Sequence, residues 1–395
     1  DGGDTSTNSG QLTDERLSGF SGGDITYQNL DQLNIKLGSG ENSLVIPSTH
    51  TGTETIVTGG DGDSAYDIGG TGGLTELIQG SLAVIAGTGT DSLIFDNSGD
   101  TQDRSGSLSE STINGFGMVD AGVSYSNFES FDMLLGQGED HLYVAGTISG
   151  SSYINTGDKN DVINIGSING HTEISSELGD DIFRVNYDEN GEQTFDNGIK
   201  GILDLHGMYG SDLYQIGLSG LGSSLINVED QPNPDAGYIG SGIDTLKVYG
   251  TQEEDFFMFR LGMVAAVEVD ENRQPIENGG VERINYDDQI ASFNIFGRDG
   301  DDTFIFDDTS SVVTADGGAG NDNFQIGQVY KSPRDEDAGL AEDDTFETTQ
   351  ITKGFLSNGI SEAASLYGGI GEDSFTVYSN KSDLSLFGQE DNDSF

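Results

Sequence analysis

One kind of residue pattern in this chain is suited to bind a ligand: aspartates that follow glycine-rich turns. The clearest copies are residues 136–144 and 317–326. In each, large apolar residues stand two and four positions after the aspartate. Glycines leave main-chain carbonyl groups accessible, and the aspartate adds negative charge. Calcium takes about six to eight oxygens at roughly 2.3–2.6 Å, whereas magnesium demands octahedral geometry and keeps its waters. The pattern therefore predicts calcium-binding turns.

The predicted calcium ligands are the anchoring aspartates together with glycines and acidic residues of the same turns. They are Gly136, Gly138, Asp140, Asp158, Asp161, Gly179, Asp181, Asp244, Asp299, Asp302, Gly318, Gly320, Asp322, Gly369, Gly371, Asp373, Asp391 and Asp393. Looser copies are anchored at Asp91, Asp212 and Asp255, and two degenerate copies carry Asn42 and Ser64 instead. Turns without metal remain the alternative, because glycine permits positive φ and aspartate caps tight turns through its own backbone.

The anchoring aspartates recur at a regular spacing. Asp140 and Asp161 are 21 residues apart, and Asp302 and Asp322 are 20 residues apart. Apolar residues alternate on either side of many turns, which is the pattern of a β-strand with one face buried. A unit of about 20 residues cannot bury its apolar side alone, so successive units must stack. We predict an all-β fold, a parallel β-solenoid with about 20 residues in each coil and the aspartates of successive coils in one column.

A second, longer repeat indicates three modules. Residues 27–38 resemble residues 125–136, and residues 283–297 form a looser third copy. We expect an acidic lead-in at 1–23, followed by solenoid modules at 24–122, 123–282 and 283–395. Turn-forming residues at 188–191 and 270–273 predict inserted hairpins, and the polar stretches 97–112 and 330–350 predict loops. Since no leader precedes Asp1 and the last repeat is cut short, we expect a segment of a longer protein.

The composition excludes several classes of protein. The chain of 395 residues has 69 acidic and 15 basic residues, and its net charge is −54. Nucleic acid and anionic membrane surfaces are not expected partners, because phosphate contacts need clustered lysine and arginine. Cysteine is absent, which excludes disulfides and thiolate sites. Membrane insertion is not expected either, because no apolar run approaches the roughly 20 residues that span a bilayer.

The turns resemble those of a known family. They follow the pattern Gly-Gly-x-Gly-x-Asp-x-U-x, where U is a large apolar residue, and residues 317–324 and 368–375 match every defined position. In this pattern the sequence resembles the repeats-in-toxin (RTX) family. The resemblance implies a parallel β-roll that folds when calcium binds in its turns outside the cell. Here the motif returns about every 20 residues instead of about every nine, so the chain is more similar to degenerate RTX-like repeats of very long cell-surface proteins.

Catalysis has little support in the sequence. The four histidines form no His-Glu-x-x-His zinc motif, and no Gly-x-Ser-x-Gly nucleophile elbow is present. Carboxylate pairs for glycoside cleavage can be chosen at will from 69 acidic residues, so no particular pair is informative. We therefore expect no enzymatic activity.

The expected function is mechanical. We expect an extracellular protein, secreted or at the cell surface, in which structural calcium stiffens a spacer, coat or filament subunit that stacks with copies of itself. One alternative is an adhesin segment whose loops at 97–112 and 330–350 bind surface glycans or ice. A second is the secretion and folding module of a secreted enzyme. Adaptation to high salt also produces acidic chains, but it scatters carboxylates over every outward face.

Overall fold

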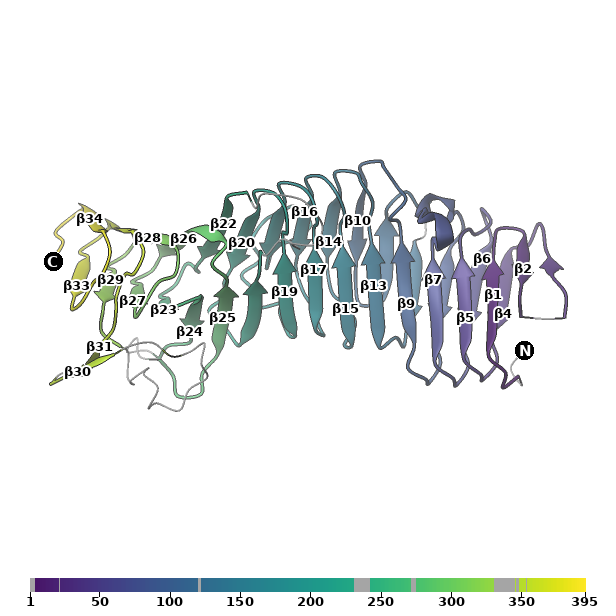
Figure 1. Cartoon of the computed structure of the whole chain (residues 1–395), viewed down its shortest axis with the longest axis horizontal. Helices are drawn as coiled ribbons and strands as arrows, with labels where there is room; N and C mark the ends of the chain where they lie inside the picture. The colour runs from purple at the N-terminus through teal and green to yellow at the C-terminus, as the bar shows by residue number, and fades with distance from the viewer. Residues whose placement is uncertain are drawn as a thin grey trace. The chain divides into compact units, whose positions relative to one another are not determined.

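The computed structural model describes residues 4–20, 22–119, 122–230, 242–270, 275–329, 345, 348–352 and 354–395. Within them the regular secondary structure is almost entirely β-strand, and most strands stack in parallel from coil to coil, so the predicted parallel β-solenoid is confirmed (Figure 1). The chain forms two compact units. Unit 1 comprises Asp1–Asp181, Asp188–Asn190 and Lys200–Met208, and unit 2 comprises Ile182–Tyr187, Gly191–Ile199 and Tyr209–Phe395.

The first ladder of unit 1 is parallel from β1 to β19. Its strands pair in the order β1 (Asn8–Leu12), β5 (Asn42–Ile46), β7 (Ser64–Ile68), β9 (Ser92–Asp96), β13 (Ser130–Leu134), β15 (Ser151–Asn155), β17 (Thr172–Ser175) and β19 (Ile202–His206). Two short strands extend β1 as an antiparallel meander, namely β2 (Arg16–Ser18) and β3 (Ile25–Thr26). Two 3₁₀ helices follow β7, at Gly70–Gly72 and Thr75–Leu77.

The second ladder of unit 1 contains an antiparallel insertion. Its order is β4 (Gln32–Lys36), β6 (Glu54–Thr58), β8 (Leu82–Ile85), β12 (Val123–Ser126), β11 (Thr112–Gly115), β10 (Ser105–Leu108), β14 (His141–Val144) and β16 (Val162–Ile165). The prediction that 97–112 loops out is therefore wrong for β10, which pairs in parallel with β14. The sequence of β10 does not show the apolar alternation of a strand, because one of its inward positions is Gly106. An added Cβ at this glycine would lie 2.3 Å from the Phe116 ring.

Unit 2 also has two ladders, one parallel throughout and one with an antiparallel insertion. Its fully parallel ladder runs through β18 (Ile182–Val185), β20 (Leu213–Gly217), β22 (Asp244–Tyr249), β26 (Ile290–Asp299), β28 (Val312–Ala319), β32 (Ala364–Ile370) and β34 (Leu384–Glu390). The other ladder includes an antiparallel meander and runs through β21 (Ser224–Val228), β25 (Val281–Tyr286), β24 (Met263–Val267), β23 (Phe256–Arg260), β27 (Thr303–Phe306), β29 (Asn323–Ile326) and β33 (Ser374–Val377).

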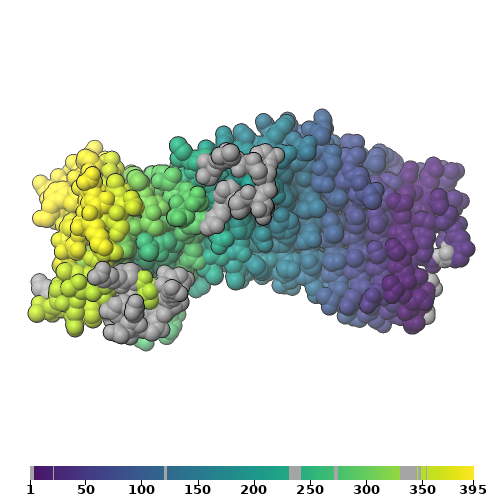
Figure 2. All heavy atoms as spheres, viewed as in Figure 1, coloured from purple at the N-terminus to yellow at the C-terminus, as the bar shows by residue number. Residues whose placement is uncertain are grey.

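Each regular coil gives one strand to each ladder, and the core lies between the two ladders. Phe304 of β27 pairs with Phe324 of β29, a register of 20 residues that confirms the predicted coil length. Alternate residues are buried in many of the strands, such as β9, β15 and β29, as the apolar pattern predicts. Because each coil occupies one layer of its unit, successive coils appear as successive bands of colour on the surface (Figure 2).

The predicted insertions are only partly described. An antiparallel bridge joins Tyr187 to Gln193, which confirms a hairpin around 188–191. A second antiparallel bridge joins Val269 to Pro275, but residues 271–274 between them lie outside the described residues. Of the predicted loop at 330–350, residues 330–344 and 346–347 lie outside the described residues. Its end forms a small antiparallel hairpin of β30 (Thr349–Ile351) and β31 (Gly354–Leu356).

Candidate metal centre

The anchoring aspartates of unit 1 form a buried column. Asp140 and Asp161 directly precede β14 and β16, and together with Asp181 they are at most 1 % exposed. Oδ1 of Asp161 accepts a hydrogen bond from the main-chain N–H of Asp140 at 2.7 Å. Oδ1 of Asp181 accepts in the same way from Asp161 at 2.7 Å. Each carboxylate thus continues the hydrogen bonding between coils by one residue into the turn.

Unit 2 has a similar column in the ladder that contains β23, β27, β29 and β33. Oδ1 of Asp302 accepts from the N–H of Asp255 at 2.8 Å, and Oδ1 of Asp322 accepts from Asp302 at 2.7 Å. The column continues through Asp373 at 2.8 Å and Asp393 at 3.1 Å. The predicted alignment of the aspartates from successive coils is therefore present in both units.

Residues directly before several of the anchoring aspartates make a second series of hydrogen bonds, which was not predicted from the sequence. Oδ1 of Asp301 accepts from the N–H of Asn321 at 2.7 Å, and Oδ1 of Asn321 accepts from Glu372 at 2.9 Å. Asn160 accepts from Asp180 in the same way at 3.0 Å. These bonds run from the later coil to the earlier one, opposite to those of the anchors. The signal was present in the sequence as Asp or Asn placed immediately before the anchor.

The glycines of the motif have a steric role in these turns. A Cβ added at Gly317 would lie 2.0 Å from Oδ2 of Asp322, five residues later. Gly320 has a φ of 144°, and its Cβ would lie 1.9 Å from the carbonyl oxygen of Gly300. The other predicted glycines also face a main-chain carbonyl group of the neighbouring coil within 2.1 Å of an added Cβ, namely Gly136, Gly138, Gly179, Gly318, Gly369 and Gly371. Close stacking of turns thus requires glycine with or without a metal ion.

Three of the predicted acidic ligands lie outside the columns. Asp158 is half-buried and forms a parallel bridge with Leu178, whereas Asp299 and Asp391 are exposed. Asp391 also has a left-handed backbone, with φ of 78°. These carboxylates lie on the outer side of the turns.

Burial dominates the electrostatics of the columns. Loss of solvent raises the pKa of Asp161 and of Asp302 from the ordinary 3.8 to about 8, and neighbouring carboxylates add to the rise. The same cause raises the pKa of Asp181 and of Asp322 to about 7. Oδ2 is buried without a hydrogen-bond partner among the described atoms in Asp91, Asp161, Asp302, Asp322 and Asp373. Near neutral pH, each column therefore favours a bound proton or a bound cation.

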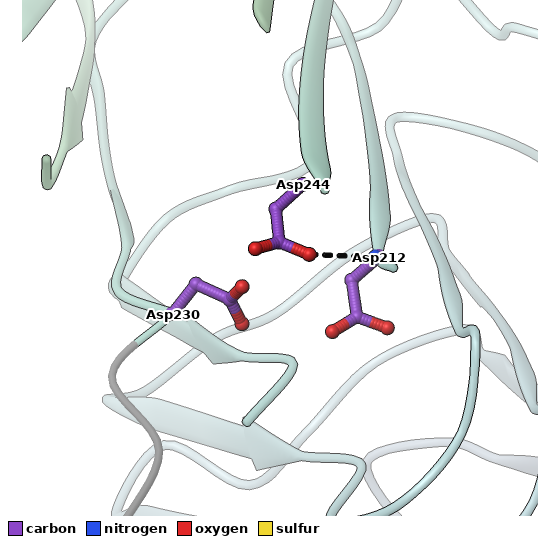
Figure 3. A group of neighbouring side chains, drawn as sticks. All are labelled: Asp212, Asp230 and Asp244. Carbon is purple, nitrogen blue, oxygen red and sulfur yellow. Dashed lines mark hydrogen bonds between the residues drawn. The ribbon is translucent and has the colours of Figure 1, made fainter. Parts of the chain in front are cut away.

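Three aspartates of unit 2 converge more closely than any others. Asp212, Asp230 and Asp244 each place a carboxylate oxygen within 4.8 Å of the other two, the single such group of three acidic, His or Cys residues among the described residues. Figure 3 shows the three carboxylates facing a common space. Asp244 was predicted as a ligand and Asp212 as a looser anchor, whereas Asp230 was missed. Asp230 follows β21, on the ladder opposite the strands that Asp212 and Asp244 begin.

Hydrogen bonds fix the orientation of this group. Oδ1 of Asp244 accepts from the N–H of Asp212 at 2.9 Å, and the Tyr214 hydroxyl donates to Oδ1 of Asp230 at 3.0 Å. Burial, followed by the neighbouring Asp244 carboxyl and the Asp212 charge, raises the pKa of Asp230 to about 8. A site made of three carboxylates offers oxygen ligands and no others, which is the kind of site that hard divalent cations prefer. Elsewhere in the described turns, a calcium ion would need main-chain carbonyl oxygens to complete its shell.

No protein-family model matches this chain, and a search of curated proteins finds no match. The described residues include no helix of the length and apolar character that crossing a membrane requires.

Replacing Asp302 by alanine tests the hydrogen-bonding role of a column. The buried N–H of Asp255 would lose its acceptor, which costs about 1–3 kcal/mol of folding free energy. Asp302→Asn retains Oδ1 and is expected to lose far less. Urea unfolding in EDTA measures the difference, with the exposed Asp299→Ala as the matched control. Equal stability of the Ala and Asn variants would contradict a hydrogen-bonding role.

Proposed function

We propose that this chain is a structural segment of an extracellular protein, a β-solenoid spacer or fibre subunit whose coils are held together by calcium. The observation that carries this proposal is the pair of buried carboxylate columns in a chain with a net charge of −54. Closely spaced acids in such columns disfavour the compact state unless a proton or a counter-ion neutralises them. The resemblance to RTX repeats supports calcium as that counter-ion.

Calcium would act at the Gly-Asp turns as a link between neighbouring coils. The Oδ2 atoms of Asp161, Asp302 and Asp322 have no hydrogen-bond partner among the described atoms, which leaves them available to a cation. Carbonyl oxygens of the glycine-rich turns would supply further ligands. The stabilisation would be spread over many coils, because each coil contacts only its neighbours in a solenoid. Stacked coils of this kind suit a spacer, because each coil within a unit is held by the coils on either side of it.

Circular dichroism with a thermal melt tests the proposal. The protein is melted in EDTA and across a calcium titration, with magnesium as the ion control. We expect calcium to raise the melting temperature steeply and magnesium to have little effect. Asp322→Asn keeps the Oδ1 acceptor but removes one charge, so it is expected to weaken the response to calcium, while the exposed Asp288→Asn leaves it unchanged. An identical melt in EDTA and in calcium would overturn calcium as the stabilising ion.

A further inference from the structure

We propose that Asp212, Asp230 and Asp244 form one calcium site, in which two anchors of the Gly-Asp turns are joined by a carboxylate from the opposite ladder. The other turn aspartates of a column all come from the same edge of one ladder. Here Asp230 comes instead from the end of β21 in the opposite ladder, and its carboxylate faces those of Asp212 and Asp244 (Figure 3). A cation at this point would therefore link the two ladders of unit 2.

An unpartnered oxygen points to a ligand here. Asp244 is 1 % exposed, and its Oδ2 is buried without a hydrogen-bond partner among the described atoms. Its Oδ1 is already occupied by the N–H of Asp212, so Oδ2 is the oxygen turned toward the Asp230 carboxylate. A buried carboxylate oxygen without a partner is costly to maintain, and a cation shared with two further carboxylates would remove that cost.

The burial of the site favours calcium over magnesium. The three ligand oxygens lie within 4.8 Å of one another, close enough to share one cation. All three aspartates are at most 1 % exposed, and magnesium gives up its waters reluctantly in such a site. The Tyr214 hydroxyl, which donates to Oδ1 of Asp230, holds that carboxylate in orientation.

The test counts bound ions and then locates them. Native mass spectrometry in calcium is applied to the full chain, to Asp230→Asn and to Asp288→Asn, an exposed acid of the same unit. We expect Asp230→Asn to bind one ion fewer than the full chain, and Asp288→Asn to bind the same number. Circular dichroism confirms that each variant is folded, and Asp244→Asn serves as a second variant if Asp230→Asn fails to fold.

Crystals of the full chain soaked in terbium, which substitutes for calcium, give the position by anomalous scattering. A peak among the three aspartates that is absent in Asp230→Asn supports this site. Peaks confined to the other Gly-Asp turns would overturn this inference and leave the proposed function standing. A peak at the three aspartates alone would support the inference and contradict calcium in the other turns. No peak at either place would overturn both.

Discussion

In EDTA, lowering the pH from about 8 to about 5 is expected to make the protein more stable, contrary to ordinary acid denaturation. The cause is the set of buried carboxylates, because burial raises the pKa of Asp161 and of Asp302 to about 8, and of Asp322 to about 7. In the unfolded chain these groups have their ordinary pKa of 3.8. The folded state therefore binds more protons, and stability falls as the pH rises.

The pH window follows from these pKa values. The stabilising contribution is complete below about pH 4 and is lost as the pH rises toward 8. Each group contributes on the order of 1.4 kcal/mol per pH unit while it titrates, so several groups together amount to several kcal/mol. Thermal melts at several pH values measure the slope. Asp161→Asn with Asp302→Asn should flatten the slope, whereas Asp299→Asn should not. A melting temperature that falls steadily with acid would contradict the prediction.

Calcium should change this pH dependence in a defined direction. A bound cation favours the ionised carboxylates, so metal affinity rises with pH. The increase in melting temperature caused by calcium should therefore be largest near pH 8 and small near pH 5. The slope measured in EDTA thus also serves as the reference against which calcium binding in the columns is recognised.

The regular part of the fold was predictable because its physical determinants are local. The 20-residue spacing between Asp302 and Asp322 requires coils that stack in phase, and the alternation around Phe304 and Phe324 specifies which side chains face the core. Gly-x-Gly-x-Asp turns indicate where one strand ends and the next begins. The two-ladder solenoid follows from these features together.

The irregular parts were not predictable because their determinants are far apart in the sequence. β10 has only Leu108 as a large apolar residue, and its other inward position is Gly106 beneath the Phe116 ring. The packing of that glycine depends on a neighbouring strand, which a sequence pattern does not specify. Asp230 was missed for a similar reason. Nothing around it repeats, and its approach to Asp212 and Asp244 depends on residues far from it in the sequence.

The anchoring aspartates show why identical residues support two interpretations. The sequence indicates a metal ligand because glycine and aspartate recur together, whereas in the structure Oδ1 of Asp322 accepts a hydrogen bond from the Asp302 N–H. Both roles use the same carboxylate, since one oxygen serves the neighbouring coil and the other has no hydrogen-bond partner among the described atoms. The repetition of the motif fixes the position of the carboxylate in the column. Measurements with and without metal decide what else that carboxylate binds.

Replacing Phe324 by alanine is expected to cost about 3–5 kcal/mol of unfolding free energy, the usual range for a buried phenylalanine. Phe324 is fully buried, and its ring stacks on Phe304 at 4.7 Å and on Phe375 at 4.8 Å. Its removal therefore leaves a cavity between three successive coils. Urea unfolding followed by circular dichroism measures the loss.

The matched control separates burial from ring stacking. Phe387 stacks on Tyr367 at 4.7 Å, a geometry close to that of the core pairs, but it is 43 % exposed. Phe387→Ala is expected to cost only about 1 kcal/mol, because it loses the ring pair without opening a cavity. Equal losses from the two variants would mean that stacking between coils, and not the closed core, supplies most of the stability.

Since each coil contacts only its neighbours, a cavity at Phe324 weakens the contacts on both sides of its coil. That coil should consequently unfold first.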